Sequence, residues 1–170
     1  MDIVDDTESD LIPFAVTASD HCGIHAALNI VGQKWALLIV RDVMSGITRF
    51  DHLRRHLGVS ETVLSNRLRA MVHSGLLSQQ EYAAPKERPR FEYVLTDAGW
   101  DLFPVLTALK RWGERHTELA DGPYWMVEHA QCGARVTAQI ACDSGHSPIP
   151  LTEISGRVGS VTAGVIDSEH

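Results

Sequence analysis

The chain has 170 residues, a formal net charge of −7 and a hydrophobic content of 44%. This length predicts one domain of about 100 residues with tails, and the apolar content is sufficient for a core. The chain has no run of about 18 apolar residues to span a bilayer, and its acidic N-terminus lacks the basic region of a signal peptide. We therefore expect a cytoplasmic protein without a membrane partner. Its three cysteines, an odd number, argue against a secreted disulfide framework.

Composition divides the chain into four segments. Residues 1–18 are polar and acidic, which predicts a disordered arm. Residues 19–120 contain the long amphipathic patterns and form the predicted main domain. Residues 121–154 predict a short C-terminal β-hairpin extension, and residues 155–170, rich in glycine and serine, predict a flexible tail.

Two helices are expected before residue 46. The first covers residues 22–31, begins at Cys22 and has Asp20 as a candidate N-cap. The second covers residues 34–45 and is apolar almost all round. That pattern predicts burial on several sides, either in the middle of a small core or at a subunit contact.

A short amphipathic helix follows over residues 50–57. Phe50, Leu53 and Leu57 share its inward face, and Thr48 is its expected cap. Residues 58–59 then form a turn into another helix. The two helices and this turn have the spacing of a helix-turn-helix.

The next helix, residues 61–74, has a signal at each end. Ser60 is a good N-cap, and Gly75 can take the left-handed conformation that ends a helix. A buried face is predicted at helical spacing for Leu64, Leu68 and Met71. The residues turned outward are short hydrogen-bonding side chains, an arginine and a histidine: Thr62, Ser65, Asn66, Arg69 and His73. Asparagine can bind adenine, and arginine guanine, through two hydrogen bonds each, so this pattern indicates a DNA-recognition helix.

A two-stranded hairpin, the wing, is expected after this helix. Residues 76–82 and 90–95 are strand-like and are separated by a proline-rich turn. Lys86, Arg88 and Arg90 lie at its tip, where a basic loop can contact phosphates. Residues 47–90 contain eight basic and four acidic residues, a local charge of +4 in an acidic chain. The candidate DNA-binding residues are Arg49, Ser60, Thr62, Ser65, Asn66, Arg69, Lys86, Arg88 and Arg90.

A long helix is expected from Asp97 to about residue 119, capped by Thr96. Pro104 lies two turns inside it, which predicts a kink and not a stop. An apolar stripe runs along the helix over Leu102, Phe103, Leu106, Leu109, Trp112 and Gly113. We expect this stripe, with the first helix, to form a two-fold dimer interface.

The chain resembles the HxlR-type winged-helix transcriptional regulators of bacteria over residues 22–116. The shared marks lie in one register at residues 22, 32–35, 41, 46, 49–50, 53, 60–69, 75–76, 89–93 and 95–99. Gly23, Gln33 and His52 depart from the usual pattern, and none lies on the predicted DNA-binding face. The resemblance implies that residues 19–120 are a winged-helix domain for DNA binding and homodimerisation, and that some relatives sense thiol reagents through a cysteine at the position of Cys22.

Three features allow functions beyond DNA binding, and each has a structural alternative. Cys22, beside His21 and near His25, is either an effector-sensing thiol or a packing residue. The C-terminal His129, Cys132, Cys142 and His146 suggest a zinc ribbon, but a glycine stands where the fourth knuckle ligand belongs, so no metal is predicted. The aromatic residues either line a pocket for a small-molecule effector or fill the core: Trp35, Tyr93, Trp100, Phe103, Trp112 and Trp125.

Together these patterns predict a mainly α fold with a β-hairpin wing, a winged helix-turn-helix, plus the C-terminal hairpin. The chain has no phosphate loop, nucleophile triad, paired-carboxylate motif or HExxH, so neither catalysis nor a cofactor is expected. The predicted function is a homodimeric regulator, a repressor, that binds a palindromic operator in double-stranded DNA and responds to an electrophile or small molecule. The alternative is a winged-helix module that binds protein instead of DNA.

Overall fold

The computed structural model describes residues 22–82, 90–118 and 125–155. Its contacts divide the chain into two units, residues 26–138 and a second unit made of residues 1–25 with 139–170. The larger unit contains the helix-turn-helix and the hairpin. Within the described residues, no single helix is long and apolar enough to cross a membrane, and only the pair α1 and α2, bent by 76°, matches that length and composition.

Two helices precede the helix-turn-helix. Helix α1 covers Gly23–Val31 and α2 covers Ala36–Met44. The all-round apolarity of α2 has the expected consequence, because Ala36, Ile39 and Val40 are completely buried. Asp20, the cap expected for α1, lies outside the described residues.

A buried carboxylate joins α2 to the helix-turn-helix. Asp42 is 1% exposed, and its Oδ1 accepts hydrogen bonds from Nε and Nη2 of Arg41 at 2.9 and 2.7 Å. Its other oxygen, Oδ2, lies 2.7 Å from Nδ1 of His56, which projects from α3 (Phe50–Leu57). A buried charge is tolerated only when it is paired and hydrogen-bonded, and both conditions are met here.

The helix-turn-helix consists of α3 and α4, which covers Glu61–His73. Gly58 connects them with φ of +65°, a left-handed conformation that glycine adopts without strain. Leu53 of α3 and Leu64, Leu68 and Met71 of α4 are buried together in the core. The predicted inward faces of these two helices are therefore confirmed.

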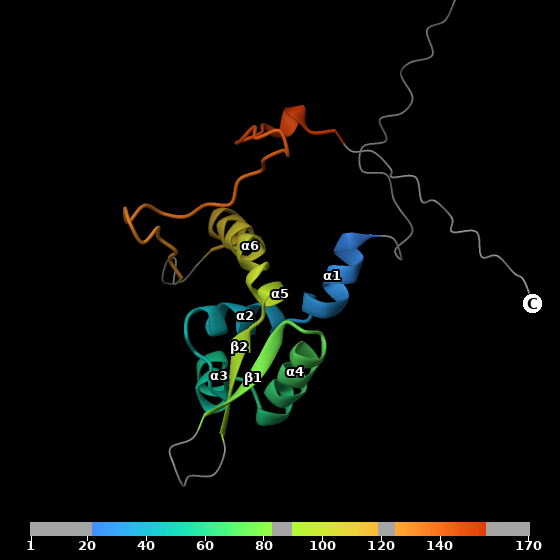
Figure 1. Ribbon diagram of the computed structural model, residues 1–170, viewed down its shortest axis with the longest axis vertical. Coiled ribbons are helices and arrows are strands. Elements are labelled where there is room, and N and C mark those ends of the chain that lie inside the picture. The colour runs from blue at the N-terminus through green and yellow to red at the C-terminus, as the bar shows by residue number, and fades with distance from the viewer. Residues whose placement is uncertain (1–21, 83–89, 119–124, 156–170) are drawn as a thin grey trace, which may run out of the picture. The chain divides into compact units, whose positions relative to one another are not determined.

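The wing is an antiparallel hairpin of β1 (Leu77–Tyr82) and β2 (Arg90–Leu95). Figure 1 shows the hairpin between α3 and α4, and the contacts agree, since α4 touches β1 and α3 touches β2. The backbone carbonyl of Thr48 accepts a hydrogen bond from the amide of Tyr93 at 2.8 Å. This bond connects the segment before α3 to strand β2. The winged helix-turn-helix is thus formed by α3, α4, β1 and β2.

Thr48 does not cap α3, contrary to the sequence-based expectation. Arg49 occupies the N-cap position without a side-chain bond. The Thr48 hydroxyl instead donates to Oε2 of Glu92 on β2, at 3.0 Å. The Thr48 side chain is thus bonded to a residue 44 positions later in the chain and not to the first turn of α3.

The predicted long helix is divided in two. Helix α5 covers Asp97–Trp100 and α6 covers Phe103–His116, so the expected kink at Pro104 is wrong. Pro104 lies in the first turn of α6, where its missing amide has no intrahelical partner to lose. The predicted cap is confirmed, because Thr96 Oγ1 accepts from the amide of Gly99 at 3.2 Å. A Cβ atom at position 99 would lie 2.4 Å from the carbonyl oxygen of Leu76. Only glycine therefore lets α5 approach the start of the wing this closely.

The C-terminal hairpin is not formed by strands in the described residues 125–155. That segment contains one isolated bridge, between Glu128 and Arg135, and a 3₁₀ turn at Leu151–Glu153. Residues 135–140 alternate in polarity, a pattern that predicted a β-strand, but no strand is formed at these positions.

Candidate nucleic-acid interface

The recognition helix α4 is fixed at its start and along its inner face. Ser60 Oγ accepts from the amide of Val63 at 3.3 Å, which satisfies one of the free donors of the first turn. The left-handed Gly75, with φ of +75°, follows the last turn. With its inner face in the core, α4 presents a defined outer face.

The outer face of α4 contains the predicted hydrogen-bonding side chains. Thr62, Asn66, Arg69 and His73 are exposed, and Ser65 is half-buried. Nη2 of Arg69 donates to Asn66 Oδ1 at 3.1 Å and lies 3.3 Å from Ser65 Oγ. These contacts hold the guanidinium against the outer face of α4, and exposed bonds of this kind can be exchanged for bonds to base edges.

Arg67 has a different role from its neighbours on α4. It is half-buried, and its Nη2 donates to Oε1 of Gln33 at 2.9 Å. Its Nε is buried without a hydrogen-bond partner among the described residues. Arg67 therefore contacts the turn between α1 and α2. Sequence patterns did not reveal that Gln33, in this turn, accepts a hydrogen bond from α4.

Arg49 lies at the junction between α3 and the wing. Its guanidinium carbon is 4.4 Å from the ring centroid of Tyr82, a cation–π contact that positions the side chain. Its backbone forms a bridge with Glu92. Sequence patterns did not single out Tyr82, although a strand pairing that places it opposite Arg90 could have done so.

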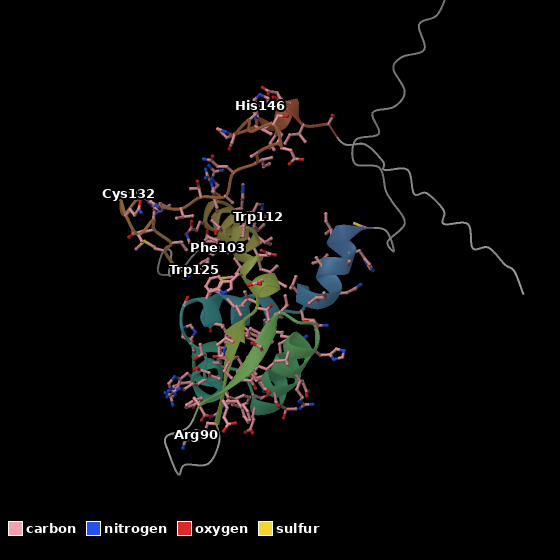
Figure 2. The ribbon with its side chains drawn as sticks, in the orientation of Figure 1. Arg90, Phe103, Trp112, Trp125, Cys132 and His146 are labelled. Carbon is pink, nitrogen blue, oxygen red and sulfur yellow. The ribbon has the colours of Figure 1, made fainter. Side chains whose placement is uncertain are left out.

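A shallow cavity of about 460 Å³ lies beside this contact. Its lining comes from the start of α3 and the outer ends of both wing strands: Arg49, Phe50, Asp51, His52, Tyr82, Arg90 and Phe91. Arg90 is exposed at the beginning of β2, where Figure 2 labels it. Lys86 and Arg88, the other predicted wing contacts, lie outside the described residues.

The sequence matches the family model described as HxlR-like helix-turn-helix over residues 30–121, more than half of the chain. The chain belongs to the HxlR-like helix-turn-helix family. It is 39% identical over 133 residues to an uncharacterized HTH-type transcriptional regulator of Mycobacterium tuberculosis, a match covering 78% of this chain and 83% of the relative. The chain is thus a transcriptional regulator with a helix-turn-helix domain, and not an enzyme.

Solved structures agree with this assignment. PA1607, described as a candidate transcription factor, is 31% identical with a TM-score of 0.68, and the match covers 82% of this chain and 94% of that one. The redox regulator HypR in its oxidized form is 27% identical with a TM-score of 0.52, covering 58% of this HxlR-like chain and 100% of HypR.

The three cysteines of this HxlR-like regulator are free thiols. Cys22 is half-buried immediately before α1, whereas Cys132 and Cys142 are exposed. Backbone hydrogen bonds from His146, and then from Ser144, lower the pKa of Cys142 because they stabilise the thiolate. Sequence patterns indicated a reactive thiol only at Cys22, since the backbone arrangement around Cys142 is not visible in residue order.

The four zinc-ligand candidates contact one another in pairs, His129 with Cys132 and Cys142 with His146. Nδ1 of His129 is 3.2 Å from Cys132 Sγ, and Nδ1 of His146 is 3.3 Å from Cys142 Sγ. Among the described residues, no group of three or more His, Cys, Asp or Glu side chains could hold a metal ion.

The aromatic residues do not converge on one pocket. Trp100 and Trp112 are 52% and 59% exposed, whereas Tyr93 is buried and its hydroxyl accepts from Gln79 at 3.2 Å. Figure 2 shows Trp125 beside Phe103, and their rings meet edge to face with centroids 6.5 Å apart. Of the two alternatives, a shared pocket and core packing, these positions give no support to a pocket lined by all six aromatic residues.

The apolar stripe of the HxlR-like α6 also differs from its prediction. Leu106 is 7% exposed and belongs to the core of its own chain, so it is not free to contact a second chain. The exposed apolar residues are Val105, Leu109 and Trp112, at 49%, 49% and 59%. Their spacing places them along one side of α6, a surface that we call the α6 stripe.

Proposed function

We propose that this regulator binds a palindromic operator in double-stranded DNA as a homodimer and acts as a repressor in the cytoplasm. The observation that supports this most strongly is the outer face of α4, where Thr62, Asn66 and Arg69 are exposed on a helix whose other side is anchored in the core. In helix-turn-helix proteins this helix enters the major groove.

Within this proposal, two groups of side chains have different tasks. Asn66 and Arg69, supported by Thr62 and Ser65, contact base edges and determine the sequence that is bound. The second group contacts phosphates and fixes the register on the duplex: Arg49, Ser60, Lys86, Arg88 and Arg90. The Arg49–Tyr82 contact supports this division, because it holds a cation at the junction where the wing meets α3.

The α6 stripe is the proposed dimer contact. Large apolar side chains at helical spacing are rarely left in water by a monomeric protein. On α1, Ile24 and Leu28 are also exposed, at 73% and 56%, and lie four residues apart on one face. A two-fold pairing through these surfaces would present two copies of α4 to successive major grooves, about 34 Å apart.

Cys22 is the proposed point of control. The likeness to HypR, a redox regulator, supports a redox response in this chain. Cys22 is partly accessible and directly precedes α1, so an adduct there would alter a helix of the proposed dimer contact. A small displacement would change the spacing of the two recognition helices and weaken binding to a fixed operator.

Selection of bound sequences from a random library of duplexes tests this function. The proposal expects an enriched inverted repeat with half-sites about one helical turn apart. It also expects the sedimentation mass of the complex to correspond to two protein chains on one duplex. Enrichment of no sequence, together with weak binding that disappears with salt, would leave only nonspecific electrostatic attraction and would contradict the proposal.

A further inference from the structure

A second cavity lies between α6 and the segment that follows it, and no residue of the proposed DNA interface lines it. Its volume is about 430 Å³, within the range of small-molecule sites. Its lining comes from one side of α6 and from the C-terminal segment: Thr107, Lys110, Arg111, Glu114, Arg115, Val127, Arg135, Val136 and Thr137.

The C-terminal wall of this cavity is held in place by specific contacts. Trp125 packs edge to face on Phe103 at the start of α6. The segment then folds back on itself, because the amide of Val136 donates to the carbonyl of Val127 at 2.9 Å and the amide of His129 to that of Ala134 at 2.8 Å. As a result, Arg135 and Val136 lie next to α6 and line the cavity with it.

The charges in the cavity are unbalanced. Four cations and one carboxylate line it, a local charge of +3 in a chain whose net charge is −7. Nζ of Lys110 pairs with Glu114 Oε1 within a single helix turn, so the only acid is already occupied. Among the described residues, the guanidinium groups of Arg111, Arg115 and Arg135 have no ion-pair partner. Arg111, Arg115 and Arg135 are exposed, so water screens their mutual repulsion in part, and an anion bound between them would offset the rest.

We propose that this cavity binds a small organic anion with at least two carboxylate or phosphate groups. The planar guanidinium groups supply paired donors that match such groups. Val127 and Val136 supply an apolar wall for the carbon skeleton between the charges. The site therefore selects a compact polyanion and not a neutral aromatic molecule.

The cavity remains accessible in the proposed dimer. Because an α-helix has about 3.6 residues per turn, Thr107 and Leu109 point about 160° apart. Thr107, Lys110, Arg111 and Glu114 thus lie on the side of α6 opposite to the α6 stripe. Binding of the anion requires neither a partner subunit nor DNA.

Isothermal titration calorimetry on the full chain tests the proposal without DNA. Citrate and inorganic pyrophosphate are titrated separately at about 0.15 M ionic strength, where weak nonspecific attraction is screened. The double variant Arg111→Gln/Arg135→Gln removes two of the unpaired cations. Arg54→Gln/Arg55→Gln removes the same charge from α3, outside the cavity, and is the matched control.

We expect saturable binding of at least one of the two anions, and the anion that binds identifies carboxylate or phosphate as the preferred group. In the cavity variant the affinity for that anion should fall about tenfold or more, as expected for lost charge-assisted hydrogen bonds. In the control variant the affinity should be nearly unchanged. Glu114→Gln should strengthen binding, a gain that partial unfolding could not produce. Absence of saturable binding with both anions, or equal weakening in the two double variants, would overturn the proposal.

Discussion

Arg67 on the recognition helix is hydrogen-bonded to Gln33, 34 residues earlier, in the turn between α1 and α2. The bond, 2.9 Å from Nη2 to Oε1, connects the helix proposed to contact bases with the end of the helix that Cys22 precedes. A displacement of α1 therefore has a direct route to α4. The family resemblance marked Gln33 as a departure, and the structure gives this departure a physical role.

Substitution of Gln33 tests whether this bond stabilises the domain. Gln33→Ala leaves Nη2 of Arg67 unpaired beside an Nε that already lacks a partner among the described residues. We expect the free energy of unfolding in urea to fall by about 1 kcal/mol. Gln33→Glu should retain the contact, whereas Gln80→Ala, at an exposed wing position, should change stability by less than about 0.5 kcal/mol. Equal stability of wild type and Gln33→Ala would show that the bond contributes nothing.

The α6 stripe is tested by placing a charge on it. Leu109→Asp should give a monomer at micromolar concentration in sedimentation velocity, because an unpaired carboxylate in an apolar contact costs several kcal/mol. Leu109 is half-exposed, so its own subunit should still fold. The matched control is Leu151→Asp, at a position 76% exposed in the 3₁₀ turn Leu151–Glu153, which should remain dimeric. A wild-type protein that sediments as a monomer would rule out the dimer.

The proposed thiol switch predicts a separation between two cysteine variants. Cys22→Ser should bind the operator normally and keep binding it after treatment with diamide, because it has no thiol before α1. Cys132→Ser should lose operator affinity under diamide as the wild type does. If Cys22→Ser loses affinity to the same extent as wild type, Cys22 is a packing residue.

The pH dependence of alkylation tests the environment of Cys142. Its lowered pKa means that the thiolate is present at a lower pH in the folded chain than in the unfolded one. In Cys22→Ser/Cys132→Ser protein, the rate of reaction with iodoacetamide should therefore rise at a lower pH when folded than in urea. Coincident rate profiles would mean that the backbone bonds from His146 and Ser144 do not stabilise the thiolate.

The elements that sequence predicted correctly are those specified by local signals. Helix α4 has a serine cap, a three-residue apolar face and a closing glycine, so its bounds and its outer face were visible in residue order. The wing strands were equally evident from alternation around a proline-rich turn.

The errors have non-local causes. Thr48 has a side-chain partner 44 residues away, and no helix-cap rule can anticipate that bond. Pro104 is compatible with a kinked helix or with the first turn of a new one, and periodicity cannot distinguish them. Leu106 has the same helical spacing as an interface residue, but the core of its own subunit covers it. The cationic cavity forms because the chain folds back and brings residues 135–137 to α6. No sequence motif predicts this fold-back.

The measurement that tests the central claim most directly is a comparison of base preference in Arg69→Ala and Lys86→Ala by fluorescence anisotropy. A panel of operators with single base changes is titrated with each variant over a range of salt concentrations. Arg69→Ala should cost about 1 to 3 kcal/mol on the best operator and relax the preference at one position of each half-site, because it removes a contact to a base edge. Lys86→Ala should weaken all sequences alike and reduce the salt slope by about one unit, as expected for a lost phosphate contact. If both variants bind every operator as the wild type does, α4 and the wing do not form the DNA interface.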